Sequence, residues 1–77
     1  MPKLPVLSGK EIIKVLTKIG FVETRQKGSH VILKRKIKDG EIGCVVPLHK
    51  EVALGTLKGI LKQANVSPEE FIESCYS

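Results

Sequence analysis

The chain has 77 residues and a net charge of +5, from 13 Lys and Arg against 8 Asp and Glu. This length predicts one small domain, residues 1–77, which buries only about 60–65% of its unfolded surface and has no room for a deep, lidded cavity. Two cysteines are too few for a disulfide scaffold or a four-ligand zinc site, and no segment has the apolar run of a signal peptide or a membrane span. We therefore expect a soluble, cytoplasmic protein whose active site is a shallow surface or is completed by a partner.

Residues 1–7 are expected to form an extended leader, because each of its two prolines disfavours a helix before it. A helix should then begin at Ser8, where Glu11 stands three residues on and completes a capping box. Its apolar positions recur at helical spacing, and Gly20 should end it in a left-handed conformation. These signals predict one amphipathic helix near the start of the chain.

Three strands are expected next, at residues 21–27, 30–37 and 42–46. They are joined by a tight reversal at Gly28-Ser29 and by the Asp39-Gly40 pair that two-residue hairpins favour. Strands connected by such short turns form an antiparallel meander.

Alternation along the second strand separates its residues into two faces. One face carries Val31, Leu33 and Ile37, with Arg35 as the exception; the other carries His30, Ile32, Lys34 and Lys36. The apolar face should pack on the helices, which leaves His30 on the opposite face with Lys34 and Lys36. The faces of the first strand cannot be assigned in this way, because apolar, acidic and basic residues occupy the same set of alternate positions.

Residues 48–54 are expected to be a loop that carries His49. Thr56 should cap a second helix that ends at Asn65, and Gly59 within it suggests a close contact, since glycine there costs about 1 kcal/mol against alanine. Ser67 and Pro68 then predict a short terminal helix with a capping box. The expected fold class is α+β, in the order α-β-β-β-α with a short C-terminal helix.

Basic residues flank the histidine that opens the second strand. Six of them fall within fourteen positions, with no acid until Asp39 (Arg25, Lys27, Lys34, Arg35, Lys36 and Lys38). A cationic surface holds a nucleic-acid backbone without reading its sequence, and histidine exchanges a proton near neutral pH. A ribonuclease needs this combination, but a basic RNA-binding module with one incidental histidine would look the same.

The candidate site follows from this pattern. His30 is the candidate for proton transfer, His49 is a possible second histidine, and Gly28 and Ser29 form the supporting turn. The candidate RNA-binding residues are Arg25, Lys27, Lys34, Arg35 and Lys36.

Metal-dependent hydrolysis and a bound cofactor are not expected, because the carboxylates are scattered and no phosphate-binding glycine loop is present. RNA offers a metal-free route, in which its own 2′-OH attacks the adjacent phosphate. Histidine can supply either proton transfer, worth roughly 10²–10⁴-fold in rate, and lysine or arginine can stabilise the charged phosphorane.

Four segments, in order and with matching spacing, resemble the HicA family of toxin ribonucleases. They are Ile19-Gly20-Phe21, Lys27-Gly28-Ser29-His30, Val46-Pro47-Leu48-His49, and the run from Gly55 to Ala64 that is followed by Val66-Ser67-Pro68-Glu69-Glu70-Phe71. The resemblance covers residues 8 to about 73.

This resemblance implies a fold similar to a double-stranded-RNA-binding domain, with the helices on one side of a three-stranded sheet. It also implies a toxin that cleaves mRNA, with the catalytic histidine at position His30. The partner that it implies is a HicB-like antitoxin that covers this histidine. The Pro-x-His element of the family maps onto Pro47 and His49.

Three hypotheses remain open from the sequence: a metal-independent endoribonuclease, a non-catalytic RNA-binding module on the same fold, and a basic face that mainly binds the acidic surface of an antitoxin. The second would show salt-sensitive binding to duplex RNA without cleavage.

Overall fold

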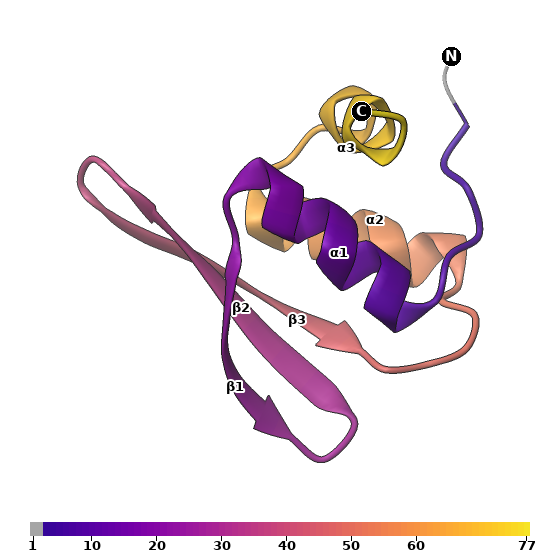
Figure 1. Cartoon of the computed structure of the whole chain (residues 1–77), viewed down its shortest axis with the longest axis horizontal. Coiled ribbons are helices and arrows are strands. Elements are labelled where there is room, and N and C mark those ends of the chain that lie inside the picture. Colours follow the sequence, from indigo (N-terminus) through magenta and orange to yellow (C-terminus); the bar gives the residue numbers. More distant parts are fainter. Residues whose placement is uncertain (1–2) are drawn as a thin grey trace.

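The computed structural model describes residues 3–77, in which three helices and three strands follow one another along the chain (Figure 1). They are α1 (Gly9–Ile19), β1 (Val22–Lys27), β2 (His30–Ile37), β3 (Gly40–Pro47), α2 (Leu54–Ala64) and α3 (Pro68–Cys75). The strands form one antiparallel sheet in the order β1-β2-β3. This is the α+β layout that the sequence predicts.

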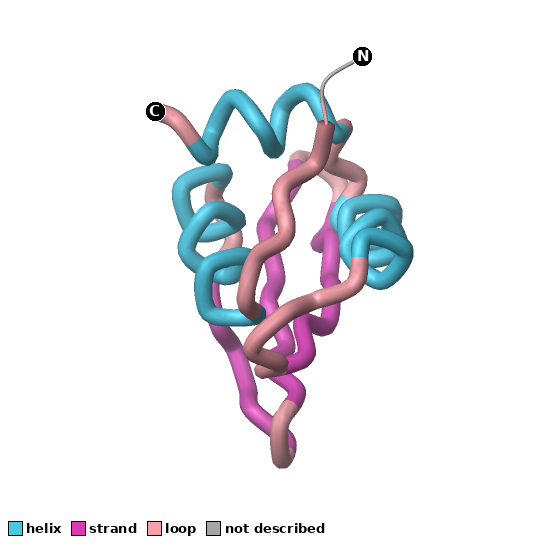
Figure 2. Tube along the Cα trace, turned by 90° about the vertical axis from the view of Figure 1, so that its right-hand side faces the viewer, coloured by secondary structure: helices cyan, strands magenta, loops and turns pink. Residues whose placement is uncertain are grey.

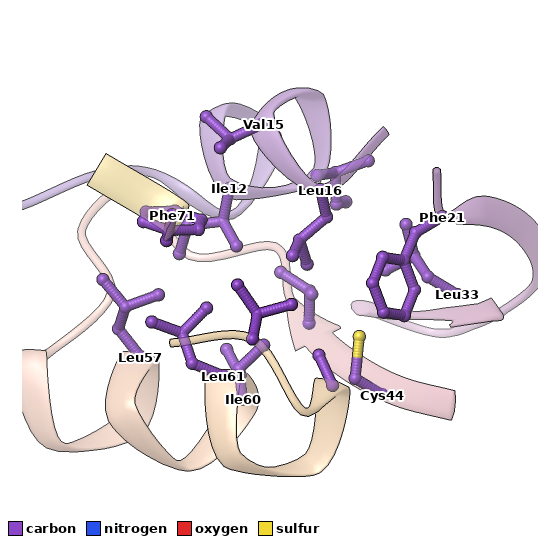
Figure 3. Close-up of a cluster of buried hydrophobic side chains, with 14 of the residues drawn as sticks. Ile12, Val15, Leu16, Phe21, Leu33, Cys44, Leu57, Ile60, Leu61 and Phe71 are labelled. Atoms are coloured by element: carbon purple, nitrogen blue, oxygen red, sulfur yellow. The ribbon is translucent and has the colours of Figure 1, made fainter. Parts of the chain in front are cut away.

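The core lies between the sheet and the helices. Alternate residues of β2 and β3 are buried, and α1 and α2 both contact β3, while α3 packs on α1 and α2 rather than on the sheet. Figure 3 shows apolar side chains of the helices meeting those of the strands in one cluster. The helices therefore cover one face of the sheet and leave the other face open.

The leader is described from residue 3 onward, and Met1 and Pro2 lie outside the described residues. The described part has no helix and passes between α1 and α2 (Figure 2). Leu4 and Leu7 pack against the core, and the Val52 N–H donates to the Leu7 carbonyl at 2.8 Å. The leader is thus a packed part of the domain.

The expected ends of α1 are confirmed. The Glu11 N–H donates to Ser8 Oγ at 3.1 Å, and the Ser8 N–H donates to Glu11 Oε1 at 2.9 Å, so the capping box is complete. The bond that the Ser8 N–H donates to the Glu11 carboxylate, followed by interaction with the Ser8 side chain, favours the ionised carboxylate and lowers the pKa of Glu11. Gly20 ends the helix with φ 114, a left-handed value that favours glycine.

The start of α2 differs from the prediction. The helix begins at Leu54, after Ala53, whose side chain cannot accept a hydrogen bond, and Thr56 lies inside the first turn. The prediction of Thr56 as the cap was wrong, because Val52 is already fixed by its bridge to Leu7 and the chain enters the helix directly from there. The predicted end is confirmed, since Asn65 is left-handed with φ 56.

The second hairpin turn and the start of α3 also differ in detail. Ile37 pairs with Gly40, so the turn residues are Lys38 and Asp39, and Gly40 opens β3 with φ 151. At α3, Pro68 is the first helical residue as predicted, and the Glu70 N–H donates to Ser67 Oγ at 3.1 Å. This is one half of the predicted capping box, since the described residues show no return bond from the Ser67 N–H to the Glu70 carboxylate.

Gly59 makes no close contact, contrary to the prediction: apart from its chain neighbours and the nearby backbone of its own helix, no described atom lies within 4 Å of the place that a Cβ would take. We expect Gly59→Ala to stabilise the protein by about 0.5–1 kcal/mol, because alanine loses less conformational entropy in a helix. Gly28→Ala is the matched control. It also meets open space, but φ at Gly28 is 60, so this variant should be destabilised. Urea unfolding of both variants measures the difference, and a destabilised Gly59→Ala would contradict the expectation.

Two free cysteines differ in burial. Cys44 is 2% exposed, and burial raises the pKa of its thiol to about 11; Cys75 is half-buried, and burial raises the pKa of its thiol against the opposing charge of Lys18. At pH 8 we expect iodoacetamide to modify Cys75 first and Cys44 only after unfolding, because alkylation needs an accessible thiolate. Peptide mass mapping over time measures the order. Equal rates at the two cysteines in the folded protein would show that the core around Cys44 opens easily.

Candidate active site

A two-residue turn places His30 at the start of β2. Lys27 pairs with His30 across the turn, and of the two turn residues only Gly28 has a positive φ, 60, as in turns of type II′. The Gln26 side-chain amide donates to the Gly28 carbonyl at 3.0 Å and supports the turn from within β1. His30, Gly28 and Ser29 are all exposed.

A bulge at Thr24 reorganises β1. Glu23 pairs with Leu33 and Arg25 pairs with Ile32, so Thr24 is an extra residue, and its hydroxyl donates to the Ile32 carbonyl at 3.2 Å. Because a bulge shifts the alternation of side chains by one residue, Arg25 lies on the same side of the sheet as Val22, and Glu23 lies on the opposite side. The one sign of this bulge in the sequence was that apolar, acidic and basic residues occupy alternate positions of the first strand without separating into two faces.

The register now defines the open side of the sheet, since directly paired residues of antiparallel strands point to the same side. We call this side the outer face, and its residues are Val22, Arg25 and Lys27 of β1, His30, Ile32, Lys34 and Lys36 of β2, and Glu41, Gly43, Val45 and Pro47 of β3. Its four cationic side chains and His30 are exposed. The prediction that His30, Lys34 and Lys36 share one face is confirmed. The bulge places Arg25 and Lys27 on the same face.

Arg35 lies elsewhere. It pairs with Ile42 on the face that the helices cover, is half-buried, and its Nε lies 3.6 Å from the place that a Cβ on Gly20 would take. Of the five candidate RNA-binding residues, Arg35 is therefore the one that does not share the face of His30.

His49 is exposed at the same end of the sheet as His30. His30 pairs with Pro47, and the ladder continues one step further, because the Leu48 N–H donates to the Ser29 carbonyl at 2.7 Å. The backbone thus holds the segment that carries His49 against the turn that carries His30.

Gly9 is a positioning residue that sequence reasoning missed. Its N–H donates to the His49 carbonyl at 2.9 Å, and a Cβ on Gly9 would come within 2.9 Å of the Leu48 Cα and would clash with the Pro47 carbonyl. The start of α1 therefore sits directly on the segment 47–49. A glycine in the first turn of a helix gives no sign of such a distant contact.

Charge on the outer face is graded from one end to the other. Glu41 pairs with Lys36, six residues along β2 from His30, which is a separation of about 20 Å in an extended strand. Lys27, by contrast, is directly opposite His30. The histidine end of the outer face is cationic, whereas the far end carries a carboxylate.

Within residues 3–77, no group of three or more His, Cys, Asp or Glu side chains could hold a metal ion. No helix in this part of the chain has the length and apolar character needed to cross a membrane.

A family model for the HicA toxin of bacterial toxin–antitoxin systems matches residues 9–66, well over half of the chain. The chain belongs to the HicA toxin family. The match includes the turn with His30, the Pro47–His49 segment and the whole of α2, while α3 lies beyond it. No match to a curated protein was found.

Membership of the HicA family supports the function of a toxin in a toxin–antitoxin system, and it implies an antitoxin as partner. The family is generally one of endoribonucleases. The predicted resemblance to HicA toxins is therefore confirmed.

Proposed function

We propose that this HicA-family chain is an endoribonuclease that cleaves mRNA without a metal ion and uses His30 for proton transfer. The observation that carries the proposal is the outer face, where His30 and four cationic side chains stand exposed together. An open, shallow face of this kind suits a long polyanion better than a small substrate.

The proposed reaction is an internal transesterification of RNA. The 2′-oxygen loses its proton and forms a bond to the adjacent phosphorus, the bond from phosphorus to the 5′-oxygen breaks, and the leaving 5′-oxygen takes a proton. The products are a 2′,3′-cyclic phosphate and a 5′-OH. His30 supplies one of the two proton transfers, a contribution of roughly 10²–10⁴-fold.

The cations have separate parts in this proposal. Lys27 is directly opposite His30, where neighbouring Cβ atoms are about 4.5–5.5 Å apart, so its ammonium group can stabilise the negative phosphorane. Arg25, Lys34 and Lys36 lie farther along the outer face and can bind the phosphates on either side of the scissile bond. His49, at the same end of the sheet, is the candidate for the second proton transfer.

Incubation of the purified chain with a long mRNA in EDTA, followed by mapping of the fragment ends, tests the proposal. We expect fragments with cyclic-phosphate or 3′-phosphate ends and 5′-OH ends, and at least a hundredfold slower appearance of fragments, roughly the lower limit for one proton-transfer group, from a His30→Ala preparation purified in the same way. Cleavage that requires added Mg²⁺ would overturn the metal-free mechanism. No cleavage with RNA binding intact would favour the second candidate, a non-catalytic RNA-binding module. The same exposed cations support that candidate.

Lys34 and Arg35 are neighbours in the sequence on opposite faces of the sheet, which makes them a matched pair. We expect Lys34→Gln to weaken RNA binding and to lower the slope of log K against log[salt] by roughly 0.7, the value for one phosphate contact on a single strand. Arg35→Gln should leave the slope unchanged, because this side chain points to the helices. Fluorescence anisotropy with labelled RNA at several salt concentrations measures both slopes. An equal loss in the two variants would contradict binding at the outer face.

A further inference from the structure

Gln26 reaches the turn before His30 from the side of the sheet that the helices cover. Gln26 pairs with Val31, which is buried, and directly paired residues point to the same side. The side-chain nitrogen of Gln26 donates to the Gly28 carbonyl at 3.0 Å. Because a carbonyl oxygen only accepts hydrogen bonds, the Gly28 carbonyl points toward the Gln26 side chain and away from the outer face.

The peptide group between Gly28 and Ser29 therefore presents its N–H to the outer face. The C=O and the N–H of a trans peptide group point in opposite directions, and the described chain has no cis peptide bond. Among the hydrogen bonds within residues 3–77, none uses the Ser29 N–H. This N–H is thus an exposed donor that directly precedes His30 on the side of the sheet where His30 lies.

Two hydrogen bonds fix Ser29 from both sides. Gln26 holds the peptide group before Ser29, and the Leu48 N–H holds the peptide group after it by donating to the Ser29 carbonyl at 2.7 Å. A donor that is already oriented needs no reorganisation when negative charge develops beside it, and such donors stabilise anionic transition states. Figure 1 shows the turn at the end of the sheet, beyond the helices, where a long substrate has access.

The chemistry of this place suits a phosphate group. The phosphorane of the proposed reaction has two non-bridging oxygens that carry negative charge. The Lys27 ammonium, directly opposite His30, can stabilise one of them. An oriented backbone N–H next to His30 is a suitable donor for the other.

We propose that the Ser29 N–H donates to a non-bridging oxygen of the scissile phosphate, and that Gln26 is the positioning residue that holds this N–H on the outer face. The inference deepens the proposed function and rests on it, because the contact stabilises the phosphorane of that reaction. It gives a part in RNA cleavage to Gln26, an uncharged side chain on the side of the sheet opposite His30.

Phosphorothioate RNA tests the contact at the atom concerned. A short RNA carries sulfur in place of one non-bridging oxygen at the mapped cleavage site, and its two diastereomers are cleaved separately in EDTA, so that no metal ion contributes. Sulfur accepts hydrogen bonds more weakly than oxygen. The thio effect is the rate for the phosphate divided by the rate for the phosphorothioate, and for the diastereomer with sulfur at the Ser29 N–H we expect about tenfold or more.

Ser29→Pro and Ser29→Ala are the matched pair for the N–H. Proline removes the N–H, and its negative φ is allowed here, because Asn65 is the one described residue other than glycine with a positive φ. Alanine removes the hydroxyl and keeps the N–H. We expect Ser29→Pro to lose the thio effect of this one diastereomer, and Ser29→Ala to keep the thio effects of both.

Gln26→Met and Gln63→Met are the matched pair for the positioning. Each removes one hydrogen bond between a glutamine side chain and the backbone, since the Gln63 side chain accepts from the Val45 N–H at 3.4 Å. We expect Gln26→Met to lower the rate of cleavage at saturating RNA by roughly twofold to tenfold, the range for one hydrogen bond, with the same RNA affinity. Gln63→Met should keep both the rate and the affinity.

Equal thio effects in Ser29→Pro and the wild type would overturn the inference, and so would equal rates for Gln26→Met and Gln63→Met. A thio effect lost in Ser29→Ala would assign the contact to the hydroxyl and overturn it as well. In each of these cases the wild type still cleaves RNA, so the proposed function stands.

A thermal melt shows whether Ser29→Pro folds. If it does not, Gln26→Met decides the question, because it should reduce the thio effect of the same diastereomer while Gln63→Met leaves that effect unchanged. A wild-type chain that cleaves no RNA in EDTA would refute the proposed function and this inference together.

Discussion

Replacing His30 with alanine should lower the rate of RNA cleavage by roughly 10²–10⁴-fold, the usual contribution of one positioned proton-transfer group. RNA binding should remain, because Arg25, Lys27, Lys34 and Lys36 stay exposed on the outer face. Stability should also remain, since an exposed side chain leaves no cavity when it is shortened. Single-turnover cleavage of end-labelled RNA, with anisotropy for binding and a thermal melt for folding, separates the three effects.

His49→Ala is the companion variant, because His49 is exposed at the same end of the sheet. If His49 supplies the second proton transfer, one limb of the pH–rate profile should disappear in this variant and the other in His30→Ala. A His49→Ala profile identical to that of the wild type would assign the second transfer to another group. Full cleavage by His30→Ala, free of contaminating nuclease, would refute the proposed mechanism altogether.

Gly9→Ala should be the most damaging of the glycine substitutions. Alanine is a better helix former than glycine by about 1 kcal/mol, but its Cβ would press into the backbone of Pro47 and Leu48. Because backbone cannot move aside as a flexible side chain does, we expect a net loss of about 1–3 kcal/mol in the free energy of unfolding. The displaced segment carries His49 and is bonded to Ser29, so cleavage should fall as well.

Gly55→Ala is the matched control for this variant. Gly55 also lies in the first turn of a helix, but apart from its chain neighbours and the nearby backbone of that helix no described atom lies within 4 Å of its Cβ position. We expect it to be as stable as the wild type or more so, and fully active. Urea unfolding and the cleavage assay on both variants give the comparison. Equal free energies of unfolding would show that segment 47–49 moves aside without destabilising the protein.

Local signals in the sequence predicted the features that a few neighbouring residues determine. Ser8 with Glu11 gave the start of α1, Gly20 its end and Asn65 the end of α2, because each depends on hydrogen bonds within four or five residues. The faces of β2 followed from strict alternation along an unbroken strand. The position of His30 on the open face could therefore be predicted.

Features that depend on distant contacts could not be predicted. The bridge between Leu7 and Val52 sets the start of α2, and the clash that Gly9 avoids lies some forty residues away in the sequence. The bulge at Thr24 belongs to the pairing of two strands, so only the register shows that Arg25 and Lys27 join His30. Alternation correctly placed Arg35 on the apolar face of β2, but counting Arg35 among the candidate RNA-binding residues grouped it with cations that the register puts on the other face.

The bulge at Thr24 decides which side chains of β1 share the outer face with His30. If β1 paired with β2 regularly from Lys27 back through Thr24, Glu23 would lie directly opposite Lys34 on the outer face, and Val22 would turn toward the helices. The extra residue therefore keeps a carboxylate away from the cationic side chains around His30, and deleting it would leave the same residues paired in a regular ladder. In this chain, one uncharged residue puts the acidic and the basic side chains of β1 on opposite sides of the sheet.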